Sequence, residues 1–341
     1  MLSTATRTPP PAVRRRWVVA GAVVLLLVLV VASVALGSRS IAPGTVLDAV
    51  LHPDPTDDEH RTVQILRIPR TVLILVVGAA LGAAGTVMQA MTRNPLAEPG
   101  LLGINAGAAA GVVTGAVLTG ALTDWSFLFA LAGAAVAAVA VHTLGGASGG
   151  GGNPVRLVLA GVALTAVLGA YTSALLVSYP RIFERFRFWD AGSFQGPAAD
   201  VLAPTVALVG VGLVLALGLT RSLNALALGG DLGRALGVHP RRAWLAAGAA
   251  VVLLAGTATA AAGPIAFVGL VAPLTARAIV GPDYRRILPL GIVLAMAVLL
   301  AADVVGRLVV LPSELEASIV CALLGAPVFV GIVRRRRVPR L

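Results

Sequence analysis

The chain alternates between long apolar runs and short polar turns, and this alternation predicts membrane-spanning helices. A helix needs about 20 apolar residues to cross a bilayer, whereas the strands of a membrane barrel alternate over about ten. The runs here are long and do not alternate, so we predict an all-α polytopic integral membrane protein. Its ten expected spans lie at about 17–36, 71–91, 101–122, 127–144, 155–177, 201–219, two within 243–280, 287–305 and 315–333.

Two of these assignments depend on length. The run 17–36 exceeds the roughly 7 to 15 apolar residues of a secretory signal, which favours a span over a signal peptide. The run 243–280 contains 38 residues, nearly twice what one crossing needs. We expect two spans there that turn near Gly263 and Pro264, the second kinked by Pro273.

Arginine sets the expected orientation. All 26 basic residues are Arg, and the predicted spans place 18 on one side and 8 on the other. The positive-inside rule makes the first side, with both termini, cytoplasmic. We therefore predict basic cytoplasmic tails at 1–16 and 334–341 around a single transmembrane domain at 17–333. The net charge of +11 is explained as a topology signal, and we expect no nucleic-acid partner.

The sequence contains no recognisable catalytic or metal-binding constellation. A Walker A loop requires Lys, which is absent, so we do not expect this chain to hydrolyse ATP. Cys321 has no companion thiol, and the four His residues are scattered, so we expect no metal site and no bound cofactor. Spans two to eight have almost no ionisable residue near mid-depth, which weakens the interpretation as a proton-coupled secondary transporter. The sequence also shows no selectivity filter or charged ring, which weakens the interpretation as a channel.

Small residues recur at helical spacing in two of the predicted spans. Such stripes let another helix approach closely, although the longer one can instead face a transport path. The stripes are Gly78 and Gly82 in one span and Gly103, Gly107, Gly111 and Gly115 in the next.

Two polar regions are candidates for binding a partner. Arg67, Arg70 and Arg307 lie at span ends on the acid-rich outer side, where they are either interfacial anchors or partners for carboxylates of a docking protein. The cytoplasmic segment 221–242 mixes leucines with charges and breaks near Gly229. It predicts one or two short amphipathic helices that either cap the bundle or dock a partner.

Several motifs appear in a fixed order between residues 66 and 329. They include Leu66–Arg70 (LRIPR), Arg93–Pro99 (RNPLAEP), Leu223–Gly229 (LNALALG), Gly263–Val271 (GPIAFVGLV) and Gly325–Phe329 (GAPVF). With these motifs the chain resembles the permease subunits of ABC importers that take up ferric siderophores, haem and cobalamin. It departs from the family pattern at Leu274, where His is usual, and at Glu316, where Pro is usual.

The resemblance implies two permease subunits, identical or paralogous, in the plasma or inner membrane of a prokaryote. It also implies two cytoplasmic ATPases that use ATP and Mg, and an extracytoplasmic substrate-binding protein. The expected function is alternating-access uptake of a ferric siderophore or related metal chelate, with haem or cobalamin as alternatives and a single-component secondary transporter less favoured.

The resemblance also assigns roles to residues. Arg67, Arg70 and Arg307 match positions that receive acidic side chains of the binding protein, and Asn94 and Leu96 match the cytoplasmic gate region. The residues that match the helices coupling the permease to the ATPase are Leu223, Asn224, Leu226, Leu228, Gly229, Leu236 and Gly237.

Overall fold

The computed structural model of the chain describes residues 12–38, 41–120, 126–145, 154–196, 198–228, 233 and 238–334. These residues are mostly helical and include no strand. Seven of their helices are long and apolar enough to cross a membrane, and three further apolar helices are shorter. All ten coincide with the predicted spans, which confirms the all-α fold class. The number of crossings and the side of each terminus stay predictions.

The ten helices vary considerably in length. The long ones are α1 (Ala12–Ala35), α4 (Ile68–Thr92), α6 (Ser126–Leu144), α7 (Pro154–Ser178), α9 (Ala198–Gly218), α12 (Pro240–Ala262) and α14 (Tyr284–Val309). The shorter ones are α5 (Ile104–Thr119), α13 (Val268–Val280) and α15 (Ala317–Arg334). Helix α5 is shorter than the predicted 101–122 because Gly103 and Gly120, with φ of 71° and 78°, stand in the left-handed region at its two ends.

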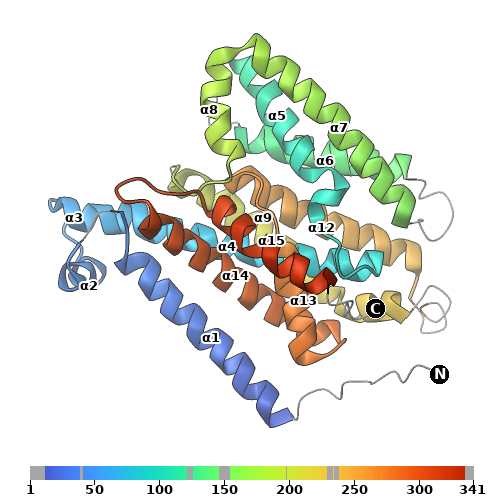
Figure 1. Cartoon of the computed structure of the whole chain (residues 1–341), viewed down its shortest axis with the longest axis horizontal. Helices are drawn as coiled ribbons and strands as arrows, with labels where there is room; N and C mark the ends of the chain where they lie inside the picture. The colour runs from blue at the N-terminus through green and yellow to red at the C-terminus, as the bar shows by residue number, and fades with distance from the viewer. Residues whose placement is uncertain are drawn as a thin grey trace.

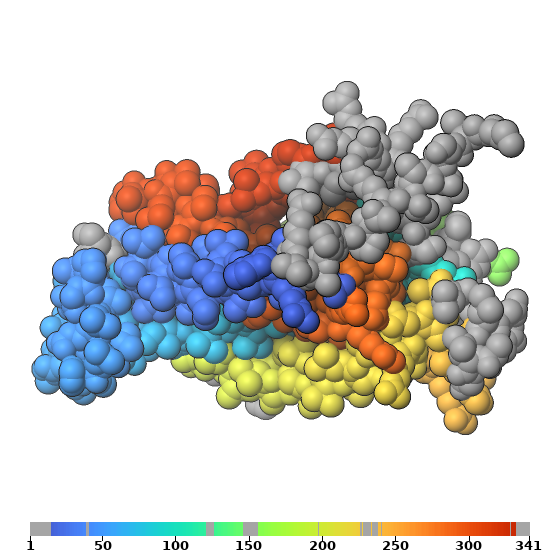
Figure 2. Space-filling view, turned by 90° about the horizontal axis from the view of Figure 1, so that it is seen from below, coloured from blue at the N-terminus to red at the C-terminus, as the bar shows by residue number. Residues whose placement is uncertain are grey.

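Helix α4 is the centre of the bundle. It packs against α9, α12, α13 and α14, and 83% of its apolar stretch is buried, against 6% for α1 at the edge (Figure 1). Figure 2 shows the face on which α1 (blue) lies beside the C-terminal helices (red). Glycine permits this packing, since a Cβ on Gly78 would lie 2.8 Å from the Cα of Met296 in α14. The small residues of α4 therefore bring two long antiparallel helices into backbone contact.

The glycine stripe of α5 faces a neighbouring helix. A Cβ on Gly107 would overlap Gly133 and Ala137, and one on Gly111 would overlap the carbonyl of Phe129. All three neighbours belong to α6, and Gly115 meets the ring of Phe129. The stripe thus serves helix packing, which resolves the two alternatives that the sequence left open.

The outer polar segments contain helices that the sequence pattern did not predict. Between α1 and α4 lie α2 (Pro43–Leu51), α3 (Asp58–Arg61) and a π-helical stretch, Thr62–Arg67, that runs directly into α4. They project from one end of the bundle, called the outer end below (Figure 1), and enclose a small apolar cluster of Ile41, Val46, Ala49 and Val63. The outer segment before α9 similarly forms α8 (Pro180–Asp190).

Candidate functional site

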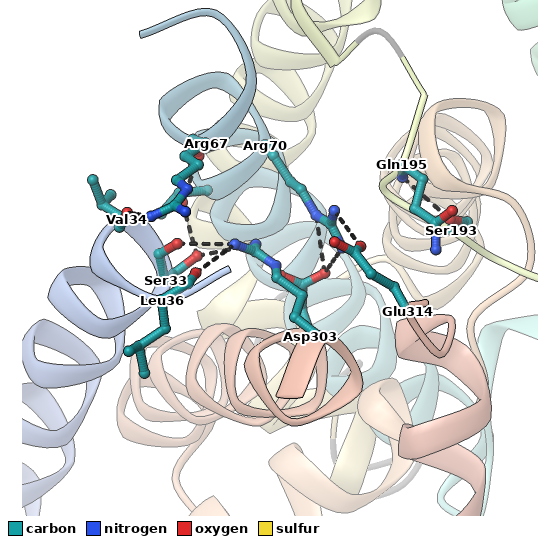
Figure 3. A network of polar contacts seen from close by, with 11 residues as sticks. Ser33, Val34, Leu36, Arg67, Arg70, Ser193, Gln195, Asp303 and Glu314 are labelled. Carbon is teal, nitrogen blue, oxygen red and sulfur yellow. Dashed lines mark hydrogen bonds and ion pairs between the residues drawn. The ribbon is translucent and has the colours of Figure 1, made fainter. Parts of the chain in front are cut away.

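Arg70, in the first turn of α4, bonds two carboxylates at the outer end of the bundle. Its Nη2 and Nε donate to Oδ1 of Asp303 at 2.7 and 3.1 Å, and its Nη1 donates to Oε2 of Glu314 at 2.8 Å (Figure 3). The Asp303 side chain is 1% exposed, whereas those of Arg70 and Glu314 are 14% and 16% exposed. The Arg70–Glu314 half of this network is therefore partly accessible from outside the chain, while Asp303 is closed off.

Arg307 lies one helical turn beyond Asp303 on α14 and is 2% exposed. Its Nη2 donates to the second carboxylate oxygen of Asp303, and its Nη1 donates to the carbonyls of Ser33 at 2.9 Å and Leu36 at 3.3 Å. The i, i+4 spacing brings the two charges together on one helix face. A buried guanidinium requires such partners, because an unpaired charge in an apolar interior is very costly.

Arg67 completes the same cluster from the end of the π-helical stretch. Its Nη1 donates to the carbonyl oxygens of Val34 and Ala35 at 3.0 and 2.7 Å. Helix α1 ends at Ala35, so Arg67 and Arg307 together bond the last carbonyls of α1, which have no partner within the helix. Two cations there also oppose the negative end of the α1 dipole.

The structure thus unites the three arginines predicted as docking residues, and gives each of them partners within the chain. Their docking role stays a prediction. The sequence did not assign a role to Asp303, which joins Arg70 to Arg307, or to Glu314, which bonds Arg70. The spacing of Asp303 and Arg307 was the available signal.

The predicted gate residues, Asn94 and Leu96, form a local turn after α4. This turn lies at the end of α4 away from the outer end, and that end is called the inner end below. Oδ1 of Asn94 accepts the backbone N–H of Leu96 at 3.0 Å, and its carbonyl accepts that of Ala97 at 3.1 Å. Arg93, with φ of 49°, reverses the chain just before them. Asn94 is exposed and Leu96 is partly buried, so this turn is available to a neighbour at the inner end.

Beyond this turn the chain re-enters the bundle and meets the segment that precedes α13. Oε1 of Glu98 accepts the backbone N–H of Phe267 at 2.9 Å. Two contacts from α4 hold the first turn of α13, next to Phe267. Gly85 lies against the carbonyl of Gly269, and Nε2 of Gln89 donates to the carbonyl of Leu270 at 3.1 Å. Sequence reasoning did not identify Glu98 as a contact residue.

The Phe267 segment arrives from the opposite end of the molecule. It begins at Gly263, where the chain leaves α12 beside the carbonyl of Trp189 in the outer helix α8. A short segment without regular secondary structure then leads to Phe267, whose φ of 67° precedes the first residue of α13. The chain that follows the inner turn and the segment that starts at the outer end therefore meet at the carboxylate of Glu98.

The predicted coupling segment is described in part. Helix α10 (Thr220–Leu228) includes Leu223, which is fully buried, and Asn224, which bonds the start of α14. Leu226 and Leu228 lie in this helix, but their side chains are outside the described part of the structure. Gly229, Leu236 and Gly237 lie outside the described residues altogether.

Comparison with known proteins agrees with this architecture. Residues 25–335 match the model of the FecCD transport family. The chain is 44% identical to the ferric enterobactin transport system permease protein FepD of Escherichia coli (strain K12), covering 89% of this chain and 91% of that protein. It is 35% identical to the hemin transport system permease protein HmuU of Yersinia pestis, covering 90% and 93%.

A solved structure described as an inward-facing conformation of a metal-chelate type ABC transporter superposes with a TM-score of 0.79. It is 26% identical and covers 94% of this chain and 99% of its own. The matches extend over the outer arginine cluster, the inner turn and the coupling segment alike. By its sequence and its fold, this chain belongs to the FecCD transport family.

Proposed function

We propose that this chain is the membrane permease subunit of an ATP-driven importer of ferric siderophores. The observation that carries the proposal is the 44% identity with the ferric enterobactin permease over nearly the full length of both chains. Other relatives include permeases for iron(3+)-hydroxamate and iron(3+) citrate. A chelate of ferric iron is the chemistry that these relatives share.

Uptake of a panel of radioactive iron chelates by cells that lack this gene tests the proposal. We expect uptake of at least one siderophore to disappear and to return with a plasmid copy. Uptake should depend on ATP and persist when an ionophore dissipates ion gradients. Persistence of uptake of every chelate in the deleted strain, or abolition by the ionophore alone, contradicts the proposal.

Haem is a second candidate cargo, favoured by the 35% identity with the hemin permease over 90% of this chain. The same uptake panel distinguishes it, because haem and a siderophore are supplied separately. Haem-dependent growth that is lost on deletion, with siderophore uptake unchanged, selects this alternative.

The partners follow from the division of labour in such importers. A second permease subunit completes the path, a pair of ATPases binds below α10, and a binding protein delivers the cargo at the outer end. Among the three outer arginines, Arg70 is the most accessible to an acidic side chain of the binding protein, since its guanidinium also reaches the partly exposed Glu314. Arg67 and Arg307 support this surface from beneath by fixing α1.

Transport then requires the inner end to open and close. The turn of Asn94 and Leu96 lies there, and the adjacent Glu98 bonds the segment before α13. We propose that this turn moves with α13 as the path opens to the cytoplasm. The exposed apolar faces of the single chain would be covered by lipid and the second permease.

A further inference from the structure

Asn224 joins α10 to the start of α14 through both ends of its side-chain amide. Its Nδ2 donates to Oδ1 of Asp283 at 2.8 Å, and its Oδ1 accepts the backbone N–H of Tyr284 at 2.9 Å. Asp283 is the N-cap of α14, and the same carboxylate oxygen accepts the N–H of Arg285 at 3.0 Å. The amide is thus bonded to the group that stabilises the first turn of α14.

The surroundings keep this junction fixed. Leu223 is fully buried beside Asn224, and Tyr284 is 2% exposed. Partial burial alone would raise the pKa of Asp283, but the hydrogen bond from Asn224 and the charge of Arg286 lower it below its ordinary value. The carboxylate is therefore ionised at neutral pH and accepts both N–H groups. Two bonds to consecutive residues restrain rotation as well as displacement of α10 relative to α14.

Helix α14 extends from this junction to the outer arginine cluster. Its 26 residues, with Pro289 in the second turn, span about 39 Å and end near Asp303 and Arg307. Along its length it packs against α4 and α13, the helices whose ends form the Glu98 contact. A movement imposed at the first turn of α14 would therefore displace Asp303 and Arg307 at its other end, in the outer network.

We infer that Asn224 is a positioning residue that transmits movement of α10 into α14 during transport. The inference rests on the proposed function, because it requires an ATPase that moves α10. It differs from an ATPase-contact role for Asn224, since its side-chain bonds are made within the permease. An amide that only satisfied buried polar groups would affect stability, and would leave the ratio of transport to hydrolysis unchanged.

An exchange of the two polar partners tests the inference in the complete importer, reconstituted in proteoliposomes with its binding protein. In N224D two carboxylates face each other, so we expect uptake to fall at least about tenfold per ATP hydrolysed. In N224D/D283N the amide and the carboxylate change places. Because one oxygen of Asp283 accepts from both Asn224 and Arg285, the exchanged amide must turn so that its N–H₂ faces position 224 while its oxygen accepts the Arg285 N–H; Asn is also a good N-cap. We expect the double variant to recover most of the wild-type ratio.

The outcomes separate the inference from the proposed function. Wild-type ratios in N224D, or a double variant that performs no better than N224D in assembly or in transport, would overturn the inference. N224A removes both bonds without adding charge, and we expect its uptake per ATP hydrolysed to fall as in N224D. If uptake and hydrolysis instead fall in parallel, Asn224 is only structural. Failure of the wild type to import any iron chelate with ATP contradicts the proposed function itself.

Discussion

Buried arginine is unusual in a membrane protein, and its partners here explain why it is tolerated. Arg307 is almost fully enclosed, yet it bonds a carboxylate and the end of α1. Arg67 uses the same helix end. Arg67 and the two Nη atoms of Arg307 thus bond acceptors in place of water, whereas the buried Nε of Arg307 has no hydrogen-bond partner among the described residues. The same hydrogen bonds therefore allow these two side chains to be buried and stabilise the C-terminal end of α1.

Acid should release the exposed half of this network. Partial burial alone would raise the pKa of Glu314, but the charge and hydrogen bond of Arg70 lower it below its ordinary value. A lowered folded-state pKa means that the stabilisation is complete above the unfolded pKa of about 4.3, and is lost as pH falls through the folded-state pKa. We expect the difference in thermal midpoint between wild type and E314Q to be constant from neutral pH to about pH 5, and to vanish at more acid pH. A difference that already shrinks near neutral pH contradicts this assignment.

The carboxylate of Glu98 should matter as an acceptor. In E98A the Phe267 N–H loses its partner inside the bundle, which costs about 1–3 kcal/mol. In E98Q the amide oxygen can still accept, so the effect should be much smaller. Thermal unfolding of the purified variants, with iron-chelate uptake as the functional measurement, tests this order. Equal damage by both substitutions would show that the charge matters more than the hydrogen bond to Phe267.

At the scale of helices, close approach depends on single glycines. A Cβ at Gly85 would overlap the carbonyl of Gly269, whereas one at Gly169 in α7 would meet nothing within 4 Å. We expect G85A to force α4 and α13 apart and to lower stability by about 1–3 kcal/mol or more. The matched variant G169A should be neutral or stabilising by up to about 1 kcal/mol, because Ala favours the helix. Detergent-solubilised protein and a thermal shift assay suffice, and similar midpoints for the two variants would refute the packing at Gly85.

The sequence predicted those helices whose positions are set by the length and polarity of apolar runs. It did not predict helix ends set by backbone conformation, or short helices stabilised by distant contacts. The spans followed from apolar runs, and the two crossings within 243–280 followed from length. The shortness of α5 depends on the positive φ of Gly103, which a hydrophobic pattern does not specify. The hydrophobic pattern does not predict the outer helices α2 and α3, because their few apolar residues form a cluster only after folding.

In the candidate sites, too, the sequence identified individual residues but not the distant residues that they contact. The three arginines were found from their motifs and their place at span ends, but their partners come from elements far apart in the chain. Glu98 and Phe267 are 169 positions apart, and Arg70 and Asp303 are 233 apart. Neither pair has a local signal such as helical spacing. Tertiary packing therefore determines which polar residues become a network, even when each residue is conspicuous in the sequence.

At the scale of the whole molecule, α4 and α14 connect the two ends. Both helices start or end at the outer network, and both pack against α13, the helix that follows the Phe267 segment. Capture of a binding protein at Arg70 would therefore act, through Asp303, on α14, the helix whose first turn Asn224 holds. This arrangement predicts that events at the two surfaces influence each other.

Competition for Arg70 provides the test at the outer surface. Glu314 occupies one edge of the guanidinium, so an acidic side chain of the binding protein must displace it or share it. We expect R70Q to weaken binding-protein affinity at least about tenfold, and E314Q to strengthen it, because the internal competitor loses its charge. Affinities of the binding protein for the assembled importer, measured at two salt concentrations, test the weaker binding expected for R70Q and the stronger binding expected for E314Q. The control is R70Q/E314Q, which lacks both charges. If E314Q weakens binding as much as R70Q does, Glu314 positions Arg70 instead of competing with the partner, and the outer network is already arranged as docking requires.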